Sequence, residues 1–121
     1  MKSQIKIFGF VYTILITLFT ANTFANSLHN ETATFKVYGN CEMCKKRIES
    51  SLKGNSAIIS AAWDVKSKVI KVVYDPHSIS IDKIHQLIAE AGHDTEKVRA
   101  SDGTYKKLPG CCQYDRKKIS E

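Results

Sequence analysis

Apolar residues recur along this chain at two spacings, every second position in some segments and every third or fourth position in others. The alternation over residues 33–37 predicts a half-buried strand that Gly39-Asn40 ends. A helical spacing begins at Glu42, and Gly54-Asn55 predicts the end of that helix. The apolar face of this first predicted helix consists of Met43, Ile48 and Leu52.

Two more alternating runs, residues 59–63 and 70–74, are joined by a polar turn and predict a β-hairpin. A second helix follows, with Ser80 as its N-cap and Gly92 just past its end. Its apolar face consists of Ile81, Ile84, Ile88 and Ala91. A more polar run from Thr95 to Ala100 predicts a last strand at the sheet edge. The order β-α-β-β-α-β predicts a ferredoxin-like α+β sandwich, with a four-stranded antiparallel sheet and both helices on one face.

The N-terminal 25 residues differ in composition from the rest of the chain. They contain Lys2 and Lys6, no acidic residue, an apolar run from Ile7 to Thr20, and small residues three before and one before the end of Thr23-Phe24-Ala25. This pattern predicts a signal peptide cleaved after Ala25, because the apolar run is shorter than the roughly 20 residues that span a bilayer. We therefore expect a periplasmic or secreted protein with no stable membrane insertion after cleavage.

The remainder is predicted to divide into a flexible lead-in (26–31), one domain (32–100) and a cysteine-containing C-terminal tail (101–121) without helical or strand period. A chain of 121 residues is too short for a multidomain enzyme. The formal net charge is +6, and it falls to about +4 without the two lysines of the signal peptide. An exported domain of such modest charge is not expected to bind nucleic acid. Its positive charge suits solubility or an acidic docking face on a protein partner.

The four cysteines fall in two close pairs, Cys41 with Cys44 and Cys111 with Cys112. Close pairs indicate a soft-metal or redox site rather than a disulfide scaffold. Cys41 and Cys44 lie between the first predicted strand and the first helix, and the two intervening residues let both sulfurs turn toward one point. The free N–H groups of the first helical turn and the two lysines that follow favour the thiolate form of Cys44. Thiolates select soft ions such as Cu(I) and Zn(II) over Mg or Ca.

The strand–CxxC–helix opening, together with the predicted order of elements, resembles the heavy-metal-associated domain family. This family includes small copper chaperones, the N-terminal modules of soft-metal ATPases and periplasmic mercury-binding proteins. Trp63-Asp64, Val72 to Pro76 and Ala91-Gly92-His93 are also similar to that family, so the resemblance covers about residues 32–100. It implies an exported metallochaperone or scavenger whose metal thiolates are Cys41 and Cys44. Cu(I) is the first expectation and Hg(II) or Zn(II) the alternatives, and a metal-transporting or metal-accepting protein is the expected partner.

Two positions bear on the details of this resemblance. The family usually has Met two residues before the first cysteine, where this chain has Gly39, and we expect Met43 to fill the vacant apolar space by packing. His93 follows the second helix, at a turn that in the family lies beside the CxxC loop. It is either a third ligand through a neutral ring nitrogen or an exposed turn histidine. The remaining histidines are expected at the surface: His29, His77 and His85.

Cys111 and Cys112 lie outside the usual domain, and two roles for them remain open. The tail could fold back over the CxxC loop and complete a four-sulfur metal site, or its thiols could form a disulfide with Cys41 or Cys44. The alternative function is a periplasmic thiol-disulfide oxidoreductase that uses the same CxxC. It is less favoured because the pattern after Cys44 is not that of thioredoxin. Haem attachment would require His at position 45, which is lysine. No Ser-His-Asp set, paired-carboxylate cleft or phosphate loop is visible, so no catalysis is expected.

Overall fold

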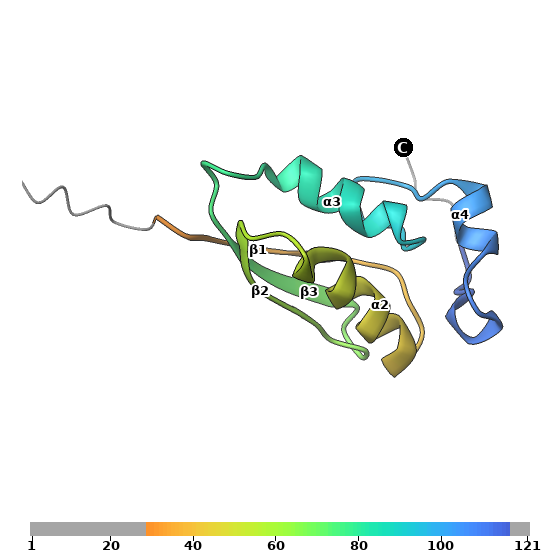
Figure 1. Cartoon of the computed structure of the whole chain (residues 1–121). Helices are drawn as coiled ribbons and strands as arrows, with labels where there is room; N and C mark the ends of the chain where they lie inside the picture. Colours follow the sequence, from red (N-terminus) through yellow and green to blue (C-terminus); the bar gives the residue numbers. More distant parts are fainter. Residues whose placement is uncertain (1–28, 117–121) are drawn as a thin grey trace, which may run out of the picture.

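The computed structural model describes residues 29–116 of the chain (Figure 1). The predicted signal peptide and its cleavage site, the first half of the lead-in and the last five residues of the tail lie outside the described residues. Between residues 29 and 116, no helix combines the length and the apolar character needed to cross a membrane.

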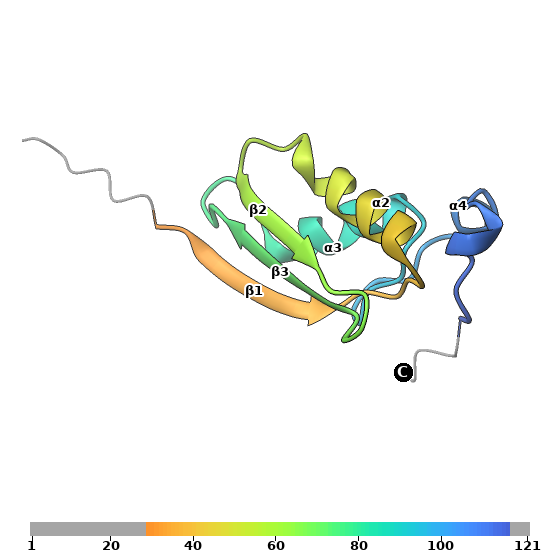
Figure 2. The same ribbon diagram turned by 90° about the horizontal axis from the view of Figure 1, so that it is seen from below.

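Three antiparallel strands form the sheet in the described residues, in the spatial order β1-β3-β2. They are β1 (Glu31–Lys36), β2 (Ile58–Trp63) and β3 (Val69–Tyr74). Two helices, α2 (Glu42–Lys53) and α3 (Ile81–Glu90), cover the same face of this sheet (Figure 2). The structure thus confirms the predicted α+β arrangement of an antiparallel sheet with two helices on one side.

The predicted fourth strand, Thr95 to Ala100, is wrong, since only Thr95 forms a β-bridge in the described residues, with Val37. The Thr95 Oγ1 accepts hydrogen bonds from the backbone N–H groups of Lys97 at 3.2 Å and Val98 at 2.9 Å. The Thr95 hydroxyl therefore accepts hydrogen bonds from N–H groups that a neighbouring strand would otherwise bind, and the segment forms a turn. The bridge still holds this segment beside the end of β1, where a fourth strand would run.

Helix α2 buries Cys44, Ile48 and Leu52 against the sheet, a spacing of four residues that places them on one face. The sequence correctly predicted that Ile48 and Leu52 lie on the apolar face of this helix. Met43 was wrongly placed on the inner face, because it is 48% exposed. The start of α2 thus turns a cysteine rather than a methionine into the core.

Helix α3 begins as predicted, because the Ser80 Oγ accepts a hydrogen bond from the Lys83 N–H at 3.1 Å. His85 was predicted to lie at the surface and is instead 3% exposed. Its ring packs on Phe35 with centroids 3.9 Å apart, and its Nδ1 lies 2.6 Å from the Thr95 Oγ1. A histidine whose polar edge has a partner is compatible with a core position.

The predicted hairpin of β2 and β3 is confirmed, with one change in the side chains that face the core. A β-bulge between Ile58 and Ser60 shifts the alternation of β2, so that Ile59 is 54% exposed and Ile58 packs against the core. The alternation is restored at Trp63, which is buried opposite Ile70 of β3.

The tail carries helical structure that its sequence did not predict. It contains the short helix α4 (Asp102–Lys106) and the 3-10 helix η1 (Gly110–Cys112). Leu108, Cys112 and Tyr114 are buried against the domain, and η1 contacts α2. In Figure 1 this dark blue segment lies beyond the ends of the helices, next to the start of α2. The tail is therefore docked at the end of the fold that carries the CxxC loop.

Candidate metal centre

The CxxC loop joins β1 to α2 and brings Cys41 and Cys44 together as predicted. Cys41 is the N-cap residue of α2, with extended backbone angles, and Cys44 lies in the first helical turn. Their Sγ atoms are 3.9 Å apart. Cys44 is fully buried and Cys41 is half-buried, so one sulfur belongs to the core and the other reaches the surface.

Gly39 lies directly beneath this loop, and the space beside it is not vacant. A Cβ at this position would lie 3.0 Å from the Cys44 Cβ and 3.1 Å from the Trp63 Cη2. The Trp63 ring is fixed there because its Nε1–H donates to the Val37 carbonyl at 3.0 Å. The expectation that Met43 packs into this space is wrong, since the indole already occupies it and Met43 turns outward.

Asn40 and Lys68 support the loop, and neither was identified from the sequence. The Asn40 N–H donates to the Cys44 Sγ at 3.2 Å, and its Nδ2 donates to the Cys111 carbonyl at 3.3 Å. The Lys68 Nζ donates to the Asn40 carbonyl at 3.4 Å. The position of Asn40 immediately before the first cysteine was the only signal available for it. For Lys68, which arrives from the β-hairpin turn, the sequence offers none.

The tail places Cys111 and Cys112 against Cys41, so it folds back over the CxxC loop. The Sγ atoms of these three cysteines all lie within 4.8 Å of one another. Cys111 is exposed, and its Sγ–H donates to the Met43 Sδ at 3.5 Å, whereas Cys112 is fully buried. All four cysteines, which lie in the described part of the chain, are free thiols.

The thiols differ in acidity because their surroundings differ. The backbone N–H groups of Cys44 and Met43, at the start of α2, lower the pKa of Cys41. Burial raises the pKa of Cys112 to about 12, and the neighbouring Cys44 and Cys111 act in the same direction. Cys41 is therefore the sulfur best prepared to meet a metal ion as a thiolate, and an ion has to displace the proton of Cys112.

His93 is fully buried, so the prediction of an exposed turn histidine is wrong. Its Nδ1 lies 2.8 Å from the Tyr38 carbonyl. A carbonyl only accepts, which assigns the proton to Nδ1 and leaves Nε2 with a lone pair. Burial lowers the pKa of His93, and its Nε2 has no hydrogen-bond partner among residues 29–116. The imidazole is neutral, as a ligand must be, but its nitrogens are not part of the three-sulfur group.

The family model for the heavy-metal-associated domain matches residues 34–94, half of the chain, and includes the CxxC loop, both helices and His93. The chain belongs to the heavy-metal-associated domain family. The match ends before the docked tail, so Cys111 and Cys112 are an addition to the heavy-metal-associated domain.

Curated and solved relatives agree with this assignment. The copper chaperone CopZ of Staphylococcus haemolyticus (strain JCSC1435) is 27% identical over 56 residues, which cover 46% of this chain and 82% of CopZ. The water-soluble region of the P-type ATPase CopA from Bacillus subtilis is 25% identical with a TM-score of 0.52, covering 55% of this chain and 44% of that one. Oxidised MerP from Ralstonia metallidurans CH34 is 19% identical with a TM-score of 0.52, covering 55% and 93%, and shares the fold. None of these relatives supports the thiol-disulfide oxidoreductase alternative.

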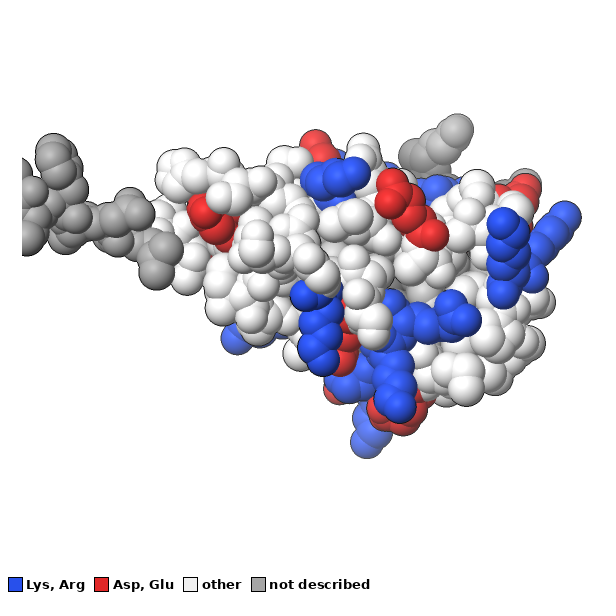
Figure 3. Space-filling model, viewed as in Figure 1, with Lys and Arg blue, Asp and Glu red and all other residues white. Residues whose placement is uncertain are grey.

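Basic side chains gather over α2 on one face of this heavy-metal-associated domain (Figure 3). Lys45 is paired with Glu49 at 2.7 Å and also donates to the Trp63 carbonyl, so its charge is largely neutralised. Lys46 and Arg47 are exposed on the same helix. The positive surface beside the thiols therefore comes from Lys46 and Arg47 rather than from Lys45.

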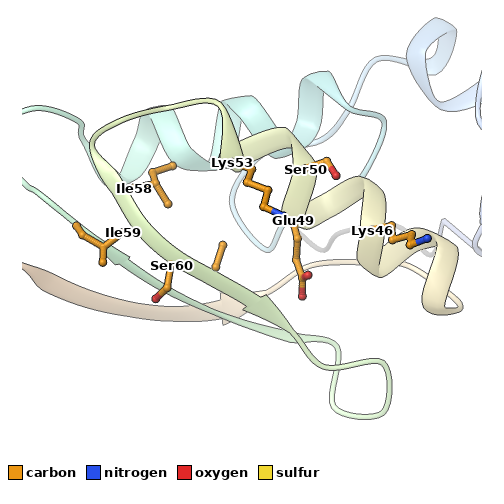
Figure 4. Close-up of a pocket in the computed structure, with 8 residues that line it drawn as sticks. Lys46, Glu49, Ser50, Lys53, Ile58, Ile59 and Ser60 are labelled. Carbon is orange, nitrogen blue, oxygen red and sulfur yellow. The ribbon is translucent and has the colours of Figure 1, made fainter.

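A groove of about 410 Å³ runs between α2 and the edge strand β2 (Figure 4). Its walls are formed by four residues of α2 and by residues 58–61 of β2, and its basic side chains are those of Lys46 and Lys53. The described lining of the groove carries no thiol or imidazole. The groove is therefore separate from the candidate metal centre of the heavy-metal-associated domain.

Proposed function

We propose that this protein is an exported metallochaperone or scavenger that binds one soft metal ion, Cu(I) in the first place, through Cys41 and Cys44. The observation that supports this most strongly is the separation of the two sulfurs at the start of α2, 3.9 Å. Two thiolates about 2.3 Å from one ion lie about 3.8 Å apart at a tetrahedral angle and about 4.6 Å apart when linear. The loop thus needs little movement to hold an ion in either geometry.

The difference between the two sulfurs suits exchange of the ion with a partner. Cys41 is half-buried and has a lowered pKa, so it is the ligand that an incoming thiolate can replace first from solvent. Cys44 anchors the ion from the core side. Transfer then proceeds by stepwise replacement of one thiolate by another, without any change in oxidation state.

We propose a metal-transporting or metal-accepting protein with an acidic face as the partner. The likeness to the soluble region of the ATPase CopA supports a transporter of this kind. Exposed Lys46 and Arg47 beside the thiols supply the complementary charge. The proposal of export rests on the predicted N-terminal signal peptide. It predicts a mature protein that begins at Asn26, which mass spectrometry of the secreted or periplasmic protein can measure.

A Cu(I) titration of the reduced protein, without oxygen and against a coloured Cu(I) chelator, tests the metal proposal. The parent should bind about one equivalent, and Cys41→Ser/Cys44→Ser should lose this binding because both thiolates are gone. Cys41→Ser alone is included because Cys44 is buried and its replacement disturbs the core. Ser50→Ala, at an exposed position of α2, is the matched control. Undiminished affinity in both cysteine variants would show that the ion binds elsewhere.

A further inference from the structure

Cys41 has sulfur neighbours from the CxxC loop and from the tail. The Sγ of Cys44 lies 3.9 Å from that of Cys41, and the Sγ atoms of Cys41, Cys111 and Cys112 all lie within 4.8 Å of one another. Three thiolates in a trigonal plane about 2.3 Å from an ion would be about 4.0 Å apart. The three sulfurs therefore have to close by less than about 1 Å to surround one ion.

We infer that Cys41, Cys111 and Cys112 form a three-thiolate site for a soft metal ion, in which Cys41 is shared with the CxxC pair. The inference rests on the proposed function, because Cys41 is a ligand in both. It extends that function by giving the ion a second position, in which two of the three ligands, Cys111 and Cys112, lie outside the part of the chain that matches the family model.

The tail is held in place by contacts that do not involve the thiols. The Tyr114 hydroxyl donates to the Gly92 carbonyl at 3.0 Å and accepts from the Asp94 N–H at 2.7 Å. Arg116 forms a two-fold hydrogen-bonded ion pair with Asp94. The sulfurs are thus brought together by the folded protein itself. An ion does not have to order the tail before it binds, which is the condition for a preorganised site.

The donor set defines the class of ion. Three thiolates favour Cu(I), Hg(II) or another soft ion over Mg or Ca. The thioether of Met43, 3.5 Å from the Cys111 Sγ, adds a further soft group beside the site. Each sulfur–metal bond replaces an S–H bond, so binding at the three thiols releases up to three protons to solvent and leaves the oxidation state of the ion unchanged.

The two positions are connected through Cys41. An ion bound to Cys41 and Cys44 gains bonds to Cys111 and Cys112 and loses its bond to Cys44, while its bond to Cys41 persists. Cys111 and Cys112 each give up their thiol proton as they bind; Cys44 takes up one proton as it leaves, and the other goes to solvent. In the second position Cys112 holds the ion from the buried side, whereas half-buried Cys41 and exposed Cys111 face solvent.

X-ray absorption of the Cu(I)-loaded protein measures the number of sulfur ligands. We expect three in the parent and two in Cys111→Ser/Cys112→Ser. Loss of a residue that only supports a metal ligand typically lowers metal affinity by roughly 10- to 100-fold. Because this variant loses two ligands themselves, its affinity for Cu(I) should fall by at least that factor. Lys107→Ser alters an exposed residue of the same tail without touching a sulfur and should behave as the parent.

Two further comparisons keep the outcome decisive. If the double variant fails to fold because Cys112 is buried, Cys111→Ser, at an exposed position, gives the answer. Two sulfur ligands in the parent and unchanged affinity in Cys111→Ser would overturn the three-thiolate site and leave the CxxC proposal intact. Undiminished binding in Cys41→Ser/Cys44→Ser would overturn both proposals, because Cys41 is a ligand in each, and a loss in both sets of variants supports the shared ligand.

Discussion

Removing the guanidinium of Arg116 should detach the tail and uncover Cys112. The Arg116 Nε donates to the Asp94 Oδ2 at 2.9 Å and its Nη2 donates to the Asp94 Oδ1 at 2.6 Å. The two side chains are only 8% and 2% exposed. A third hydrogen bond, from Nη1 to the Asp102 Oδ1 at 2.8 Å, ends on an exposed carboxylate and contributes little.

The magnitude follows from the burial of this pair. Removal of one partner of a buried ion pair costs about 3–5 kcal/mol, because the other charge stays buried without compensation. Undocking of the tail lets water reach the Asp94 carboxylate and relieves the cost of burying an unpaired charge. The lost free energy therefore appears first as local detachment of the tail rather than as unfolding of the domain. At about 1.4 kcal/mol for each factor of ten, the open fraction should rise by roughly two to three and a half orders of magnitude.

Thiol labelling of the reduced, metal-free protein measures this opening. Arg116→Met is the preferred change because it keeps an apolar stem over the Tyr105 ring, on which the guanidinium now stacks at 4.6 Å. Cys112 should change from a slowly to a rapidly labelled thiol, and mass spectrometry of the labelled peptides distinguishes it from buried Cys44. Lys107→Met, at an exposed tail position, is the control. Unchanged labelling of Cys112, with an unchanged unfolding midpoint, would refute the argument that this ion pair holds the tail.

Three further predictions concern the stability of the domain. Gly92→Ala places a Cβ 2.9 Å from the Leu108 Cδ2 at a φ of +102°, so chemical denaturation should show a loss of about 1–3 kcal/mol. Burial lowers the pKa of His85 below 6.5, so the unfolded chain takes up a proton that the folded one does not. The free energy of unfolding should therefore fall as the pH drops from 7 to 5, and less steeply in His85→Gln. Ser80→Ala removes the cap that accepts from the Lys83 N–H and should cost about 1 kcal/mol in thermal unfolding.

The sheet and both helices were predictable because their signals are local. Strand β1 and the hairpin of β2 and β3 follow from alternation, and Ser80 marks the start of α3 through a cap that spans three residues. The failures lie where a contact between distant residues decides the conformation. Thr95 binds its own turn and His85 through Oγ1, which removes the fourth strand and buries a histidine that the sequence suggested was exposed.

The candidate site divides in the same way. The approach of Cys41 to Cys44 depends on two intervening residues and a helix start, so spacing alone predicted it. The approach of Cys111 and Cys112 depends on contacts between distant residues, such as the pairing of Arg116 with Asp94, and the sequence alone does not show that these two charged residues meet. Sequence reasoning therefore left the role of the tail thiols open, between a metal site and a disulfide.

The burial of the sulfurs constrains how a partner can take the ion. Cys44 and Cys112 are fully buried, whereas Cys41 is half-buried and Cys111 is exposed. An incoming thiolate can therefore attack only on the side of Cys41 and Cys111 while the tail stays docked. Because Cys41 is common to both proposed positions, a partner that gains Cys41's place draws the ion from either one. The tail thiols therefore add ligands to the ion without creating a separate store, because Cys41 is a ligand in both proposed positions.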